Sequence, residues 1–391
     1  MKKRSLGILL SLIMVISLLT GCQSNERATE ATETVQKTEE ETGAVTSVLD
    51  MEAYTIAGPF PDTGLIGFDI LRRTLELTMA ASNGTFVYNA ADLTADGVLS
   101  FVESEIAAGV EGLIVTPPTD SVLPTICTLC EEAGVYWGIS LRSIADEEIK
   151  AIVEASPYYV GNCYEDEEET GYKAGKWMGE QGYKKIALIS QAKGDTTCDA
   201  REVGLARACE EYGIEIVAES RGFTQASDAT SATESFLSAN QELDAIFYAG
   251  TAATRAHEAT VKAIQDAGRE EVKLVTIDFP EEMGRNFESG IQVYAIGLPS
   301  IPYDCLITII KVINAIAGTP INDDGSPSSS TMSMLEITSV EDAFAYNDAL
   351  YAEGYTFYDE EIITQYLFKW NNPDLNQESL QAIIDEFSPL N

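Results

Sequence analysis

The sequence contains a single histidine, His257, in 391 residues. This scarcity excludes zinc sites built from several imidazoles and acid–base chemistry that needs paired histidines. A Ser-His-Asp triad would have to use His257, which lies in a predicted helix over residues 254–259 with no strained nucleophile turn nearby. We therefore expect His257 to be a solvated helix position.

Basic side chains are also scarce. The 24 Lys and Arg residues stand against 63 Asp and Glu, so the formal net charge is −39. This balance excludes strong binding of nucleic acid and makes an anionic membrane surface a poor partner for the folded part. Hydrophobic residues make up 45% of the chain, which is enough for a large core, and the length suits two domains of ordinary size.

The apolar run near the N-terminus is too short to span a membrane. It covers residues 6–19, or 14 residues, whereas a spanning helix needs about 20. Basic residues precede the run and Gly21-Cys22 follows it, an order typical of a bacterial lipoprotein signal. We predict a signal peptide over 1–21, lipidation of Cys22 and an extracytoplasmic protein anchored by lipid to the cell membrane. A buried hairpin or a short transmembrane helix is the alternative interpretation.

Large apolar side chains are nearly absent from residues 22–50, which predicts a flexible acidic tether. Beyond Cys22 the chain has six cysteines, too few for a disulfide scaffold. Cys127 and Cys130 have the spacing of a redox or zinc half-site but lie in an apolar helical run without a second half-site, so we expect small core residues. We predict no metal site and no cofactor.

Acidic runs at 165–169 and 322–325 lack the spaced ligand pattern of a calcium loop. We interpret the first run as the exposed first turns of a helix, where negative charge is favourable.

From residue 54 onward, short β-branched or aromatic runs alternate with segments of helical period. The pattern over 110–142 is repeated over 243–278, with a strand, a helix closed by Ala-Gly and a second strand. Such alternation predicts an α/β fold of two doubly wound parallel-sheet domains. Ligands bind beyond the carboxyl ends of such strands, so we expect a cleft between the domains.

In this frame the chain resembles the type I, ribose-binding-like periplasmic sugar-binding proteins, which are solute-binding proteins of ABC transporters. The resemblance covers about 54–318 and is carried by phrases at 112–121, 138–142, 201–205, 243–249, 275–278 and 296–299. It implies the periplasmic binding protein type I fold. We expect an N-terminal lobe of 52–161 with 298–330, and a C-terminal lobe of 162–297 with 331–391.

The resemblance also implies a ligand site. Phe68 matches an aromatic residue that packs on the sugar face, and Asp69 falls where the family often has a second aromatic. Arg142 and Arg201 match arginines that donate to sugar oxygens, and Asp278 matches a carboxylate that accepts from hydroxyls. A guanidinium with five donors and an acceptor-only carboxylate suit hydroxyls, which both donate and accept.

Three positions depart from the family pattern. Leu141, Gly250 and Gly297 stand where Asp, Asn and Gln are usual, which implies a larger ligand or one with fewer hydroxyls. Additional stacking residues near the predicted strand ends are Phe60, Tyr248 and Phe279.

Purely structural interpretations of the charged positions stay open. Asp278 could cap the helix that begins near Pro280, and Arg201 could pair on the surface with Asp199 or Glu202.

The function implied is that of a monomeric, non-enzymatic lipoprotein that delivers a sugar or sugar-like solute to an ABC permease. The alternatives are a sensing subunit read by a membrane kinase or chemoreceptor, and binding of a nucleoside or furanose-like signal. A carboxylate-based glycosidase would need an acidic pair about 5–10 Å apart, and the sequence marks no such pair.

Overall fold

The computed structural model describes residues 51–60, 66–89, 92, 94–250, 255–300 and 302–390. The predicted signal peptide, Cys22 and the tether lie outside these ranges. Within them, every helix is too short or too polar to cross a membrane.

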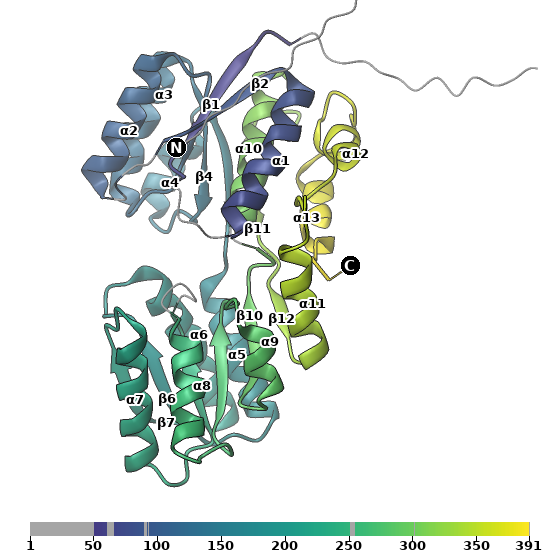
Figure 1. Cartoon of the computed structure of the whole chain (residues 1–391). Coiled ribbons are helices and arrows are strands. Elements are labelled where there is room, and N and C mark those ends of the chain that lie inside the picture. Colours follow the sequence, from purple (N-terminus) through teal and green to yellow (C-terminus); the bar gives the residue numbers. More distant parts are fainter. Residues whose placement is uncertain are drawn as a thin grey trace, which may run out of the picture. The chain divides into compact units, whose positions relative to one another are not determined.

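The first of two six-stranded sheets organises the N-terminal lobe (Figure 1). Its strands run in the order β11-β5-β4-β3-β1-β2, and every neighbouring pair is parallel. The strands are β1 (Tyr54–Gly58), β2 (Gly84–Tyr88), β3 (Gly112–Val115), β4 (Tyr136–Leu141), β5 (Tyr159–Tyr164) and β11 (Ser328–Thr331). The helices are α1 (Ile66–Ser82), α2 (Ala95–Ala108), the short η1 (Asp120–Val122), α3 (Leu123–Ala133), α4 (Glu147–Glu154) and α10 (Tyr303–Ile316).

The second sheet organises the C-terminal lobe in the order β12-β10-β9-β8-β6-β7. Its pairs are parallel except for β12, which runs antiparallel to β10. The strands are β6 (Lys185–Ser190), β7 (Glu215–Arg221), β8 (Ala245–Tyr248), β9 (Lys273–Ile277), β10 (Gln292–Gly297) and β12 (Leu335–Ile337). The helices are α5 (Glu167–Glu180), α6 (Thr196–Tyr212), α7 (Ala226–Ala239), α8 (Ala256–Asp266) and α9 (Met283–Glu288). The predicted fold class is confirmed.

Helices cover both faces of each sheet, which explains why the central strands are apolar without alternation. Ala57 on β1 faces the cluster under α2 and α3, whereas Ile56 faces α1 and α10. In the second sheet, Tyr248 faces α7 and α8 and Phe247 faces α5 and α6. Both sets are buried, as in parallel sheets between helical layers.

Local signals in the sequence fix several helix ends. Thr94 and Asp195 accept hydrogen bonds from the first-turn amides of α2 and α6, which replaces the missing intrahelical partners. α2 and α3 end at Gly109 and Gly134, whose φ angles of 87° and 72° are accessible to glycine at little cost.

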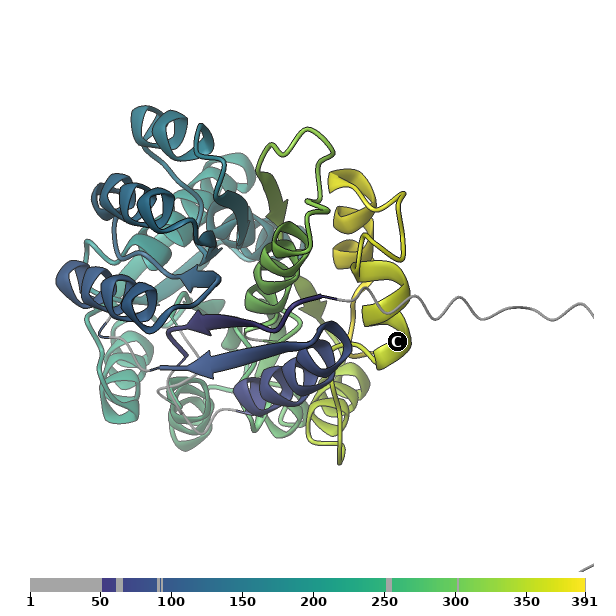
Figure 2. The ribbon, with the colours of Figure 1, turned by 90° about the horizontal axis from the view of Figure 1, so that it is seen from above.

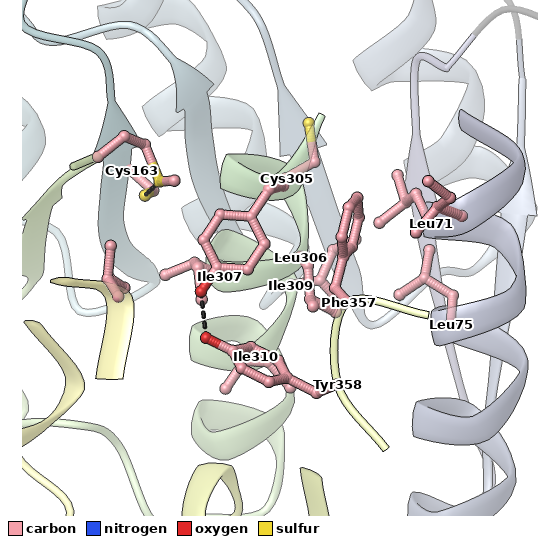
Figure 3. Close-up of a cluster of buried hydrophobic side chains, with 14 of the residues drawn as sticks. Leu71, Leu75, Cys163, Cys305, Leu306, Ile307, Ile309, Ile310, Phe357 and Tyr358 are labelled. Atoms are coloured by element: carbon pink, nitrogen blue, oxygen red, sulfur yellow. Dashed lines mark hydrogen bonds between the residues drawn. The ribbon is translucent and has the colours of Figure 1, made fainter. Parts of the chain in front are cut away.

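α10 is mostly apolar and is buried between the sheet and α1 (Figure 3). A helix of that composition is stable only inside a core. Its face toward α1 packs Leu306 and Ile310 near Leu71 and Leu75.

Lys311 is the one basic residue on α10. Its side chain is buried, and Nζ donates to Asn162 O at 2.7 Å, Ser328 O at 2.7 Å and Ser330 Oγ at 2.9 Å. Burial lowers the pKa of Lys311 to about 8. This ammonium joins β5 to β11, the two strands from which the chain crosses to the C-terminal lobe.

Three connections lead from one sheet to the other: β5 to α5, β10 to α10, and β11 to β12. After β12, the chain forms α11 (Val340–Leu350), α12 (Glu360–Ile362), η3 (Ile363–Leu367) and α13 (Gln377–Glu386). α11 packs on α9, whereas α12 and η3 contact α1 and α13 contacts β11 (Figures 1 and 2). Residues 331–391 were expected with the C-terminal lobe alone; their described part is divided between both lobes, because its apolar side chains join the cluster around α1 and α10.

α13 also covers the open edge of the first sheet. The Gln381 amide accepts from Thr331 N at 3.1 Å and donates to Thr331 O at 2.7 Å. Gln377 Nε2 donates to Ser329 O, and Gln377 Oε1 accepts from the Ser328 hydroxyl. The side-chain amides thus replace a neighbouring strand, which protects β11 from edge-to-edge association.

The expectation for His257 is wrong. This residue faces the C-terminal core from α8, fully buried, with its ring centroid 4.5 Å from that of Tyr248. Burial lowers the pKa of His257 to about 3, so the imidazole is neutral at physiological pH. The sequence showed a helix here but not which of its faces meets the sheet.

The cysteines in the described ranges are free thiols, and the expectation that Cys127 and Cys130 are core residues agrees with their burial. Cys127, Cys130, Cys163, Cys198 and Cys305 are buried, and Cys209 is partly buried. Burial raises the pKa of Cys130 to about 12, which keeps this thiol protonated and unreactive.

Candidate functional site

Two non-glycine residues with left-handed backbone lie at the carboxyl ends of strands. Leu141 ends β4 with a φ of 65°, and Asp278 follows β9 with a φ of 69°. Such conformations cost about 1–3 kcal/mol and persist where the surroundings enforce them, which is common at functional sites. The Asp278 amide donates to Ile296 O at 2.8 Å, so the turn is held against β10.

Arg201 on α6 lies at the centre of a buried charged cluster. Its Nε donates to Glu167 Oε2 at 2.6 Å, Nη2 donates to Glu167 Oε1 at 3.2 Å, and Nη1 donates to Ala249 O at 3.0 Å. Nη2 also lies 3.9 Å from Asp278 Oδ1 and 3.8 Å from Glu165 Oε2. The surface pairing with Asp199 or Glu202 does not occur, because Arg201 is 5% exposed and points inward.

Three carboxyl groups therefore surround one guanidinium. Burial and the neighbouring Glu167 hold the pKa of Glu165 well above its usual range. Burial disfavours the charged form of Arg201 and lowers its pKa. The neighbouring carboxylates of Glu167 and Asp278 outweigh this effect, so the pKa of Arg201 lies above its usual value. The cluster combines a fixed fork of donors with an excess of acceptors.

The acidic run 165–169 was expected to be exposed, and this is wrong for two of its residues. The side chains of Glu165 and Glu167 are 8% and 13% exposed and face Arg201. Glu168 and Glu169 pair with Arg207 on the surface, at 3.0 and 2.8 Å. The position of Glu165 directly after the end of β5 was a sequence signal for a site residue. Its contact with Arg201 on α6 could not be predicted from the sequence.

Glycines explain why α5 and α6 bring these charges together. A Cβ on Gly171 of α5 would lie 1.9 Å from Arg201 O, and a Cβ on Gly204 of α6 would lie 1.8 Å from Glu168 O. The backbones of the two helices are therefore in direct contact, which side chains at these positions would prevent.

Gly204→Ala should separate the two helices and lower the free energy of unfolding by about 1–3 kcal/mol, the usual cost of overpacking. Urea denaturation measures this change. Glu210→Ala, at an exposed position of the same helix, serves as the control and should stay within about 0.5 kcal/mol of wild type. Equal stability of Gly204→Ala and wild type would show that the close approach of α5 and α6 is not required.

Arg142 comes from the other lobe and reaches the same helix. Its Nη1 donates to Thr197 Oγ1 at 2.7 Å, in the first turn of α6 and one helical turn before Arg201. Its carbonyl accepts from Asn162 Nδ2 at 3.2 Å. The structure thus joins Arg142 to the element that carries Arg201.

The aromatic residues near α1 form a group within the N-terminal lobe. Phe60 stacks on Phe86 with centroids 5.7 Å apart and lies 6.3 Å from Phe68. Phe60 is buried and Phe68 partly buried. Asp69 is exposed and pairs with Arg72 at 3.5 Å, so it points away from this group.

The two remaining candidates lie elsewhere. Tyr248 belongs to the C-terminal core, between Phe223 and His257, with no exposed surface. Phe279 packs on Tyr346 of α11 with centroids 4.7 Å apart. Sequence proximity to a strand end did not distinguish a ring facing the cluster from one packed inside the lobe.

Asp304, at the start of α10, was not anticipated. Its side chain is buried, and Oδ2 accepts from Leu141 N at 2.9 Å. Burial raises the pKa of Asp304 to about 7. A buried carboxyl group therefore stands beside Leu141, where the resemblance implied an aspartate.

The stability of the protein should depend on the protonation of Asp304. Because its pKa is about 7 when folded and about 3.9 in an unfolded chain, the folded state binds the extra proton between these values, and stability falls as the pH rises from 4 to 7. The difference in unfolding free energy between wild type and Asp304→Asn should therefore change by up to about 4 kcal/mol across this range, to the disadvantage of wild type at pH 7. Thermal denaturation at several pH values measures it, and parallel curves would contradict it.

Among the described residues, no group of three or more His, Cys, Asp or Glu side chains is placed to hold a metal ion.

The comparison with family models gives a match over residues 60–301 to the periplasmic binding protein domain. The chain belongs to this family. The resemblance seen in the sequence is thereby confirmed. No curated protein matches the chain.

Solved structures show the same fold in other periplasmic binding proteins. A solute-binding protein of an ABC transporter from Actinobacillus succinogenes 130z, with bound D-allose, is 20% identical, with a TM-score of 0.60 over 75% of this chain and 99% of that one. The arabinose transporter component from Shewanella sp. ANA-3, bound to L-arabinofuranose, is 19% identical, with a TM-score of 0.59 over 77% and 96%. A protein from Bacillus halodurans C-125, with bound myo-inositol, is 15% identical, with a TM-score of 0.59 over 77% and 98%.

These relatives are matched over nearly their whole length, whereas about a quarter of this chain is not matched. The family model ends at residue 301, so the helices after β12 belong to the part of this periplasmic binding protein beyond the matched domain.

Proposed function

We propose that this periplasmic binding protein is a surface-tethered lipoprotein that binds an uncharged sugar or sugar-like polyol between its lobes and delivers it to an ABC permease. The observation that carries the proposal is the cluster at the carboxyl ends of the strands. Arg201 and Asp278 lie together there, and Arg142 of the other lobe bonds to the helix that carries Arg201. A ligand that contacts both lobes would favour the closed form of the protein over the open form.

The charges favour a neutral ligand that is rich in hydroxyls. The carboxylates of Glu167 and Asp278 alone outnumber the guanidinium of Arg201, so a phosphate or carboxylate on the ligand would be repelled. Hydroxyls can donate to the carboxylates and accept from the guanidinium groups. The ligands named for the three structural relatives are of this class.

An aromatic group on the N-terminal lobe adds an apolar face to the proposed site. Phe60 and Phe68 lie near the amino end of α1, and we assign Phe68 to the ring face of the sugar. Asp69, Tyr248 and Phe279 remain weaker candidates because their contacts lie with Arg72, the C-terminal core and α11.

Isothermal titration with allose, arabinose, ribose, galactose and myo-inositol tests the proposal. At least one should bind with a Kd of about 1 µM, which corresponds to about 8 kcal/mol, and its phosphorylated or uronic acid form should not bind. Asp278→Asn should weaken that binding at least about tenfold by removing a charge-assisted acceptor. Asp266→Asn, in an exposed ion pair with Lys262, is the matched control. Failure of every neutral polyol to bind would refute the proposed function.

The lipid anchor is tested separately. Replacing the predicted acylated residue, Cys22→Ala, should move the protein from the membrane fraction to the medium or periplasm and abolish labelling by a fatty acid, because the acyl chains supply the membrane affinity. Cell fractionation and metabolic labelling measure both effects. Retention of the variant in the membrane fraction would contradict lipidation at this residue.

A further inference from the structure

The C-terminal segment, defined here as residues 338–390, contacts both lobes and lies beyond the matched family domain. Its first part, α11, is joined to the C-terminal lobe. Phe344 covers Gly284 of α9 so closely that a Cβ there would lie 2.6 Å from the ring, and Asn347 Nδ2 donates to Glu281 O. Tyr346 is buried against Phe279.

Tyr346 brings this segment to the candidate site. Its ring centroid lies 4.7 Å from that of Phe279, the residue after Asp278. Burial raises the pKa of the Tyr346 hydroxyl, and the carboxylate of Asp278 contributes to the increase. The ring therefore supports the strained turn at residue 278, whose carboxylate we assign to the ligand.

The second part of the segment is joined to the N-terminal lobe. Arg73 Nε of α1 donates to Tyr355 O at 2.9 Å, and Phe357 N donates to Thr74 Oγ1 at 3.0 Å. Phe387 stacks on Tyr303 of α10 at a centroid distance of 4.1 Å. Figure 3 shows Phe357 and Tyr358 inside the cluster formed with α1 and α10.

One apolar cluster therefore runs through both lobes. It contains Leu71 and Leu75 of the N-terminal lobe, Met283 and Phe287 of the C-terminal lobe, and Tyr346 of α11. Separation of the lobes at this edge would expose part of that surface to water, which is unfavourable. α11 ends at Leu350, and Tyr355 is the next residue that bonds to the N-terminal lobe, through Arg73. Only residues 351–354 lie between them, so the fully extended connection spans at most about 18 Å.

We propose that the C-terminal segment is a fourth link between the lobes and that Tyr346 is a positioning residue for the ligand carboxylate Asp278. The role of Tyr346 rests on the proposed function, whereas the link between the lobes does not. The segment limits how far the lobes part and holds the rim of the C-terminal lobe in its binding geometry. Loosening the segment should then increase opening and speed ligand dissociation.

Two variants separate the hydroxyl of Tyr346 from its ring. Tyr346→Phe keeps the packing on Phe279, whereas Tyr346→Leu removes the aromatic contact. We expect Tyr346→Leu to raise the dissociation rate of the best sugar about tenfold, with a smaller effect for Tyr346→Phe. Tyr366→Phe, at an exposed position of η3, is the control. In an Asp278→Asn background, Tyr346→Leu should have no further effect on dissociation, whereas a general loss of structural support would still speed it.

The link itself is tested without any ligand. Spin labels on Glu103→Cys of α2 and Lys262→Cys of α8, both exposed, in a Cys209→Ser background report the distance between the lobes. Arg73→Ala, which removes the bond to Tyr355, and Tyr346→Leu should each broaden the distribution toward longer distances. Unchanged distributions would overturn the link. If wild type binds a sugar and Tyr346→Leu releases it at the wild-type rate, the positioning inference fails while the proposed function stands; if wild type binds no polyol, the proposed function fails.

Discussion

Arg201→Met should abolish binding of the solute and lower the free energy of unfolding by about 3–5 kcal/mol. The substitution leaves Glu165, Glu167 and Asp278 close together without the cation between them. It also leaves Ala249 O with only the weaker donor Cys198 Sγ. Removing one partner of a buried ion pair costs far more than the pair contributes, because the remaining charge stays desolvated. Titration calorimetry and urea denaturation measure the two effects.

Arg207→Met is the matched control on the same helix. Its guanidinium pairs with Glu168 and Glu169 but is 47% exposed, and exposed pairs contribute about 0–1 kcal/mol. This variant should bind the solute as wild type does. Equal behaviour of the two variants would show that the buried cluster is not the centre of the site.

Lys311→Met should lower the free energy of unfolding by about 2–4 kcal/mol, because the carbonyls of Asn162 and Ser328 would lose their buried donor. The side-chain volume is nearly kept, so a cavity does not account for the loss. Since β5 and β11 lead into two of the crossings between lobes, we also expect weaker solute binding.

Urea denaturation of Lys311→Met beside Lys262→Met tests this prediction. Lys262 is 73% exposed, and its replacement should change stability by less than about 0.5 kcal/mol. Full stability of Lys311→Met would mean that the cost of burying the ammonium cancels the three hydrogen bonds that it makes.

The fold was predictable because its signals are local. The alternation of short apolar runs with helical segments marks the strands, and glycines such as Gly109 and Gly134 mark helix ends. Arg201 and Asp278 were singled out by the family resemblance and not by periodicity, and they lie 3.9 Å apart.

Features that depend on packing between elements were not predictable. Glu165 and Glu167 belong to the cluster because Gly171 and Gly204 let two helices touch. His257 is buried because one face of α8 meets the core, and the sequence alone did not show which face. Asp304 reaches Leu141 from a distance of 163 positions along the chain.

The C-terminal segment shows the same limit more strongly. Its aromatic residues do not follow one period, because Tyr346 meets the C-terminal lobe and Phe357 meets the N-terminal lobe. A single amphipathic pattern indicates one buried face. The C-terminal segment buries apolar residues against two lobes, so no single pattern describes it.

A crystal structure with the sugar that binds most tightly tests the central claim most directly. The account predicts the sugar between the lobes, with hydroxyls within hydrogen-bond distance of Arg201 and Asp278 and a further contact from Arg142. A sugar bound elsewhere, with Arg201 still enclosed by its carboxylates and touching no ligand atom, would contradict it.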